Sequence, residues 1–109
     1  MANTAIAIYR PKDGREADLR ELLKTHVEQL RSFGLATDAP TLILRSPKDG
    51  TYLEIFDWVS DAAVESAHTH PGVKPIWDAF GEVCDFGRPC DLAEAEAIFP
   101  HFERVTGLG

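Results

Sequence analysis

Residues 51–80 constrain the fold more than any other part of this 109-residue chain, because a strand, a helix cap and two helical segments follow one another without a break. Residues 52–59 are rich in aromatic and β-branched side chains, which predicts a strand. Ser60 offers an N-cap for a helix over residues 62–68. Pro71 suits the start of a second helical segment, so we expect an interrupted helix after the strand.

The preceding part of the chain adds two strands and a longer helix. Residues 3–10 alternate in the manner of a strand, and residues 15–33 carry apolar side chains at helical spacing until Gly34 ends the pattern. Residues 41–46 form another short β-branched run. A turn of composition Pro-Lys-Asp-Gly joins this run to residues 52–59, which predicts an antiparallel hairpin.

The end of the chain gives weaker signals. Residues 86–92 are expected to form an irregular edge strand, since Pro89 is excluded from a central one. The segment AEAIFPHFERV is expected to add a short helical turn. The resulting order, βαββαβ, predicts one α+β domain over residues 1–109, with a ferredoxin-like antiparallel sheet that carries its helices on one face.

The strand over residues 52–59 is apolar on both sides. Leu53 and Ile55 point one way, whereas Tyr52, Phe56 and Trp58 point the other. When one face of an antiparallel sheet is exposed to solvent, apolar and polar residues alternate along its strands instead. We therefore predict a homodimer through the sheet face, the alternative being a monomer with an exposed aromatic-rich surface.

Charge and hydropathy exclude several classes of protein. The net charge is −7 and the basic residues are scattered, so there is no basic surface for nucleic acid. No apolar run approaches the ~18 residues of a membrane helix, and the N-terminus lacks a secretory signal pattern. We expect a cytoplasmic protein with no membrane partner. Cys84 and Cys90 fit neither a zinc motif nor a redox motif, and we expect two reduced thiols.

Nearly the whole chain resembles a known family. The opening strand followed by RPKDGREADLRELL, the strand TYLEIFDW, the turn ending in His68 and the segment PGVKPIWDAF are similar to the antibiotic biosynthesis monooxygenase family of the dimeric α+β barrel superfamily. The resemblance implies a sheet-on-sheet dimer with one small-molecule pocket per subunit. It also implies oxygen insertion into electron-rich aromatic substrates without a metal or other cofactor. The haem-degrading branch has its histidine ligand where Trp77 stands here, so haem is not implied.

Three polar aromatic side chains lie at positions that the helical pattern places on buried faces. His26 falls within the apolar stripe of residues 15–33, His68 follows Val64 by four residues, and Trp77 shares a face with neighbouring apolar residues. If both helices pack on the same sheet face, the three side chains converge. The alternatives are a histidine bonded to a backbone carbonyl and a tryptophan that fills the core.

These residues suggest a mechanism. A phenolic or enolic substrate stacks on Trp77, with Trp58 or Phe56 as a wall, and gives a proton to His68 or His26. The anion then reacts with dioxygen in a dry site. Asn3 is a candidate hydrogen-bond donor to the anion.

Other readings of the same residues remain open. Glu54 shares a strand face with the aromatic residues and is expected to pair with Arg45 across the strands, unless it faces the pocket as a rival base. We expect no metal site, because His68 and His70, two residues apart, point in different directions. A non-catalytic, small-ligand-binding or stress-responsive dimer is the alternative to a monooxygenase, and an isomerase or lyase is a third reading.

Overall fold

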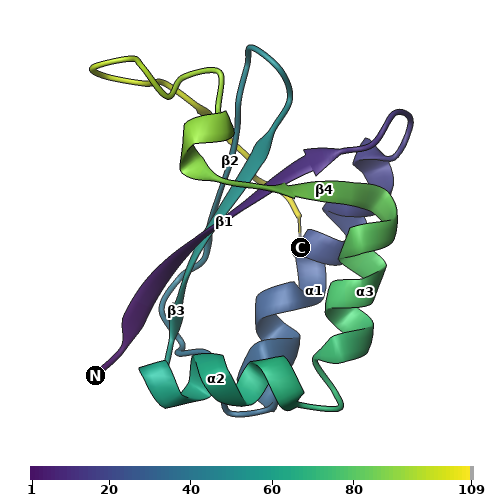
Figure 1. Cartoon of the computed structure of the whole chain (residues 1–109), viewed down its shortest axis with the longest axis vertical. Helices are drawn as coiled ribbons and strands as arrows, with labels where there is room; N and C mark the ends of the chain where they lie inside the picture. Colours follow the sequence, from purple (N-terminus) through teal and green to yellow (C-terminus); the bar gives the residue numbers. More distant parts are fainter. Residues whose placement is uncertain (109) are drawn as a thin grey trace.

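The structure, a computed structural model, describes residues 1–108 and forms one sheet with helices packed against it (Figure 1). Within these residues the sheet has five strands, all antiparallel, and there are three α-helices. In chain order the elements are β1 (Asn3–Pro11), α1 (Glu16–Ser32), β2 (Leu42–Arg45), β3 (Tyr52–Trp58), α2 (Asp61–Thr69), α3 (Lys74–Val83), β4 (Cys84–Gly87), the 3-10 helix η1 (Pro89–Asp91) and β5 (Glu103–Arg104).

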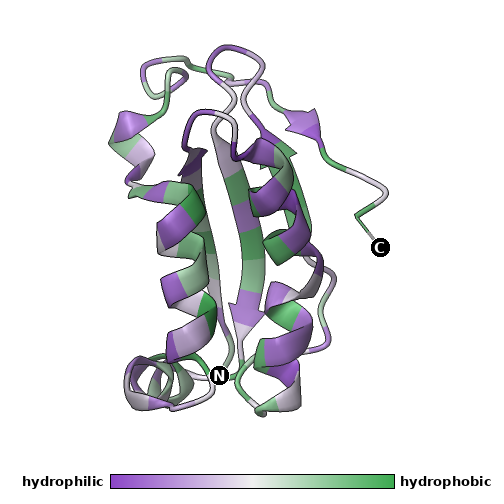
Figure 2. Ribbon diagram, turned by 90° about the vertical axis from the view of Figure 1, so that its right-hand side faces the viewer, coloured by the Kyte–Doolittle hydropathy of each residue, from purple (hydrophilic) through white to green (hydrophobic). Residues whose placement is uncertain are grey.

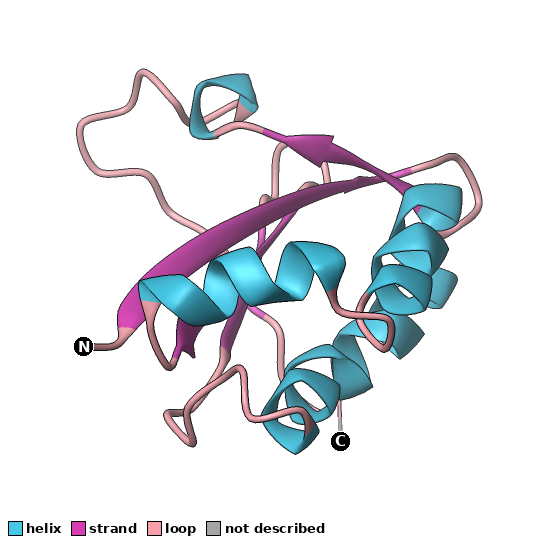
Figure 3. Cartoon of the chain, turned by 60° about the horizontal axis from the view of Figure 1, so that its bottom comes forward, coloured by secondary structure: helices cyan, strands magenta, loops and turns pink. Residues whose placement is uncertain are grey.

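The strand order in the sheet is β4-β1-β3-β2-β5. The two crossovers, through α1 and through α2 with α3, place the helices on one side of the sheet (Figure 3). This α+β arrangement is compatible with the ferredoxin-like fold expected from the sequence. No helix within residues 1–108 is long and apolar enough to cross a membrane.

The helices form close to where the sequence pattern predicts them, except that α3 begins at Lys74 rather than at Pro71, with Pro75 in its first turn and Pro71 in the preceding turn. The face of α1 that packs inward carries Leu19, Leu23, His26, Val27 and Leu30, which recur with the helical period (Figure 2). The Oγ atom of Ser60 accepts a hydrogen bond from the backbone N–H of Ala63 at 3.1 Å, so the predicted N-cap of α2 is confirmed.

The end of the chain differs from the expectation. Only the first residues of the predicted edge strand are extended, in β4, because Pro89 cannot extend the ladder and instead opens η1. In the segment expected to add a helical turn, residues 95–96 form a turn and residues 98–99 a bend, with no helix, and the strand β5 was not predicted. It is two polar residues long, too short to show any periodicity.

The core lies between the helices and one face of the sheet. Its two clusters centre on Phe56 and Trp58 and on Tyr52 and Phe80. The residues of β3 that face the helices are therefore Tyr52, Glu54, Phe56 and Trp58, as alternation along a strand requires.

The opposite sheet face carries no α-helix (Figures 1 and 3), and the residues at its centre are apolar. Strand register makes its residues direct neighbours, since Ile6 lies opposite Ile55 and Leu44 lies opposite Leu53. We call this the outer face and define it by the side chains of Ile6, Ile8, Leu42, Leu44, Leu53 and Ile55.

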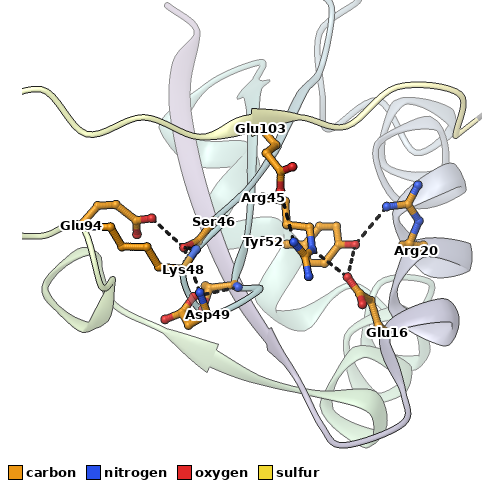
Figure 4. Close-up of polar contacts among 10 residues, drawn as sticks. Glu16, Arg20, Arg45, Ser46, Lys48, Asp49, Tyr52, Glu94 and Glu103 are labelled. Carbon is orange, nitrogen blue, oxygen red and sulfur yellow. Dashed lines mark hydrogen bonds and ion pairs between the residues drawn. The ribbon is translucent and has the colours of Figure 1, made fainter.

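Residues 88–102, which we call the arm, connect β4 to β5 and extend past the end of the sheet, on the side away from α1 and α3 (Figures 1 and 3). Within the arm, all of which the structure describes, Glu94 is the only buried residue. Its carboxylate accepts a hydrogen bond of 2.6 Å from the hydroxyl of Ser46, at the end of β2 (Figure 4). A second tether joins the Arg10 guanidinium to the carbonyl of Asp91 at 3.1 Å.

Candidate functional site

A cavity of about 360 Å³ lies beside β1, at the point where β4 ends. Strand β4 pairs only with residues 8–11 of β1, so within the described chain the edge of residues 3–7 on that side is free. The cavity wraps around this free edge, and the exposed side chains of Ile6 and Phe86 stand at its opening. Its walls are formed by Ala5, Ile6, Ala7, Ile8, Tyr9, His26, Phe56, Trp58, Trp77, Phe86 and Gly87.

The walls of this cavity are apolar and aromatic. No lysine, arginine, aspartate or glutamate of the described residues lines it. The polar side-chain groups on its walls come from Tyr9, His26 and the two tryptophans. Such walls favour a flat, uncharged ligand that forms one or two specific hydrogen bonds.

His26 is the titratable centre of the site. It projects from the buried face of α1, and its Nδ1 atom lies 2.8 Å from Oε1 of Glu54 on β3. The hydroxyl of Tyr9 donates to the same oxygen, also at 2.8 Å. All three side chains are buried, with exposed fractions of 3% or less. The other oxygen of Glu54, Oε2, has no hydrogen-bond partner among the described residues.

The neighbouring tryptophan fixes the tautomer of His26. An indole N–H can only donate, and Nε1 of Trp77 lies 3.3 Å from Nε2 of His26. Nε2 must therefore hold a lone pair, and the proton of the neutral imidazole resides on Nδ1, where it is donated to Glu54. The result is a histidine whose unprotonated nitrogen lies at the cavity wall.

Tyr9 is held as a hydrogen-bond donor. Its burial, and secondly the negative charge of Glu54, raise the pKa of the Tyr9 phenol well above its ordinary value. The phenol therefore stays protonated and donates a hydrogen bond to Glu54. Its ring stacks on Phe80 at 4.9 Å between centroids, which fixes its orientation.

The residues predicted from the sequence separate into two groups. His26, Trp77, Trp58 and Phe56 line the cavity together. His68 does not line it: this side chain is exposed at the surface of α2, and its ring lies edge-on to Trp77 at 5.4 Å between centroids.

Asn3 also lies outside the cavity wall. Its side-chain amide donates to the carboxylate of Asp61 at 2.7 Å, which joins the start of β1 to the start of α2. Through this bond Asn3 connects two structural elements, and its amide faces Asp61.

The predicted pairing of Glu54 with Arg45 is wrong. Register places Ile43 opposite Glu54, and Arg45 lies opposite Tyr52. The Arg45 guanidinium instead pairs with Glu16 at 2.9 Å and with Glu103 at 3.2 Å (Figure 4). Glu54 is thus free to form a hydrogen bond with His26. The sequence signal that could have predicted this pair is the position of a carboxylate on the helix-facing side of β3.

Both cysteines are free thiols, Cys84 buried and Cys90 exposed. Among residues 1–108, no group of three or more His, Cys, Asp or Glu side chains is placed to hold a metal ion. Comparison of the chain with models of protein families, with curated proteins and with solved structures finds no match.

Proposed function

We propose that this chain is a cofactor-independent monooxygenase-like enzyme of the antibiotic biosynthesis monooxygenase type, acting on a small aromatic or polyketide-like molecule. One observation carries the proposal: at the wall of an apolar cavity, Nε2 of His26 holds a lone pair that only a long 3.3 Å contact with the Trp77 indole engages, while Glu54 holds Nδ1. A buried carboxylate that orients an imidazole and stabilises its protonated form is the arrangement that a general base requires.

The geometry suggests how a substrate hydroxyl binds. A phenolic or enolic oxygen that replaces the 3.3 Å contact between Trp77 and His26 accepts a hydrogen bond from the indole and donates its own proton to Nε2. Trp58 and Phe56 bound the ring system from the sheet side. Both the position of the hydroxyl and the plane of the rings are then defined.

The proposed reaction converts a methylene flanked by aromatic rings into a carbonyl. His26 takes the proton of the enol form, and the resulting anion transfers one electron to dioxygen. Recombination of the two radicals forms a carbon–oxygen bond, and the peroxide takes back the proton from His26. Loss of water then breaks the oxygen–oxygen bond and the remaining carbon–hydrogen bond, so one oxygen atom becomes the carbonyl oxygen and the other leaves as water with that proton.

The proposed assembly is a dimeric α+β barrel in which the outer faces of two copies pack together. The outer face supports this, because Ile6 is 56% exposed and Leu42, Leu44 and Ile55 are partly exposed in the single chain, whereas Ile8 and Leu53 are already buried. Apolar surfaces of this kind are characteristic of interfaces between subunits. Sedimentation at micromolar concentration should give twice the chain mass of 12.1 kDa, and a single-chain mass would contradict the dimer.

One observation favours the alternative, a non-catalytic ligand-binding protein. Trp77 already donates to Nε2 of His26, so the base is occupied until a ligand displaces the indole. A protein that only stores a ligand needs no free base. The two functions share the cavity and differ in turnover.

Oxygen uptake with a panel of anthrones and quinols separates them, after subtraction of the spontaneous oxidation rate. The enzyme should consume one dioxygen per anthrone, and His26→Gln should abolish this uptake. His68→Gln is the matched control, because His68 also contacts Trp77 but lies outside the cavity. Thermal stabilisation by the panel without oxygen uptake would support the binding protein, and equal loss in both variants would contradict the role of His26.

A further inference from the structure

The most exposed apolar side chains in the described part of the chain occur at two places. Among residues 1–108 and apart from Met1, the large apolar side chains that are more than half exposed are Ile6, Phe86, Ile98 and Phe99. Ile6 and Phe86 stand at the opening of the cavity. Ile98 and Phe99 lie on the arm and are 89% and 80% exposed. Two adjacent side chains this exposed contact almost nothing within their own chain.

Contacts with the sheet hold the arm on both sides of its tip, residues 98–99, but not at the tip itself. Glu94 holds it to Ser46, and β5 returns the chain to the sheet beside β2. The cavity opening lies at the other edge of the sheet, where β4 ends beside β1. The arm begins at β4, beside that opening, but its tip, residues 98–99, lies between the Glu94–Ser46 contact and β5, which are both beside β2.

The arm extends on the side of the sheet that carries no helix, which is the side of the proposed subunit interface (Figures 1 and 3). If two copies pack through their outer faces, each arm extends toward the other copy. A twofold axis makes such a contact reciprocal, because each subunit gives its arm and receives its partner's.

We infer that the arm of one subunit closes the cavity of the other, with Ile98 and Phe99 seated against Phe86 and Ile6 at the free edge of β1. This inference rests on the proposed dimer. The site is then incomplete in a single chain. The second copy supplies the apolar cover that keeps water from His26, which a reactive anion in the cavity requires.

Site-specific crosslinking tests the contact. Cys90→Ser removes the exposed thiol, and Cys84 is buried and remains. In this background, chains carrying Phe86→Cys are mixed with size-tagged chains carrying Phe99→Cys, exchanged at mild denaturant, and treated with a short bis-maleimide. The expected product is a heterodimer containing one tagged and one untagged chain, formed at least tenfold faster than in the control mixture. The control uses Val59→Cys in place of Phe86→Cys, since Val59 is also partly exposed but lies away from the cavity opening.

Each other result overturns the inference. If sedimentation gives a dimer without the heterodimeric product, the arm does not reach the partner's cavity, although the proposed sheet-face dimer stands. A mass of one chain overturns both. If a chain carrying both cysteines crosslinks within itself at high dilution, the cavity is closed by its own arm. None of these outcomes depends on the oxygen-uptake assay, so the proposed reaction is tested separately.

Discussion

Replacement of Tyr9 by phenylalanine removes a hydrogen bond to the Glu54 carboxylate and thereby tests whether that carboxylate is charged. The Tyr9 hydroxyl donates to Oε1 of Glu54 at 2.8 Å, and both side chains are buried. The substitution removes one oxygen atom and leaves the ring stacked on Phe80. A hydrogen bond to a charged group contributes about 1.5–3 kcal/mol, against about 0.5–1.5 kcal/mol for a neutral pair. We expect Tyr9→Phe to lower the free energy of unfolding by about 2 kcal/mol.

The same substitution in a Glu54→Gln background should cost only about 1 kcal/mol, because the acceptor is then neutral. The difference between the two costs is a coupling free energy of about 1 kcal/mol, large enough for a double-mutant cycle. Urea unfolding at pH 7 measures it. With a slope of about 1.5 kcal/mol per molar urea, Tyr9→Phe alone shifts the midpoint by roughly 1 M.

Two results would refute this reasoning. If Tyr9→Phe changed stability by less than 0.5 kcal/mol, about the size of an ordinary surface substitution, the hydroxyl would not donate to a buried charge. If the cost were the same with glutamine at position 54, Glu54 would be neutral in the folded protein. A neutral Glu54 could not stabilise a protonated His26, and the proposed base would lose its positioning residue.

Three further predictions concern parts of the chain away from His26. Burial raises the pKa of the Cys84 thiol to about 11, so between about pH 9 and 11 the folded state retains a proton that the unfolded state loses, and the free energy of unfolding should fall as pH rises through this range. Urea unfolding across pH should show a less steep fall in Cys84→Ala and the same fall as the unsubstituted protein in the Cys90→Ser control. Ser60→Ala removes the N-cap of α2 and should lower the free energy of unfolding by about 1 kcal/mol; no change would show that α2 does not depend on its cap. Gly81→Ala adds a methyl group to the exposed last turn of α3, where the nearest atom outside the helix is 4.0 Å away, and should raise the melting temperature through a stabilisation of about 0.5–1 kcal/mol, whereas a lower value would contradict the packing of α3.

Periodicity explains why much of the fold could be predicted. The apolar spacing of α1 placed His26 on the buried face, and the alternation of β3 grouped Glu54 with the aromatic residues that face the helices. Each of these statements concerns one element at a time. That His26 meets Glu54 is a contact between α1 and β3, which depends on how the helix lies across the sheet.

His68 shows where the pattern misleads. Its spacing from Val64 suggested an inward position, but the buried residues of α2 are Ala63 and Ala67, each one position earlier. Alanine carries little hydropathy signal, so a stripe built from alanines is easily displaced by one residue in a sequence reading. His68 follows Ala67 and therefore lies at the exposed edge of that stripe.

The protonation state of His26 tests the central claim most directly. Four histidines are present, and ¹⁵N-histidine labelling with the His26→Gln variant assigns the resonances of this one. From the contacts of the two ring nitrogens we expect the proton on Nδ1, protected from exchange, and an unprotonated Nε2 whose resonance shifts when a naphthol or anthrone is added. A proton on Nε2, or an Nε2 resonance that no aromatic hydroxyl perturbs, would contradict it.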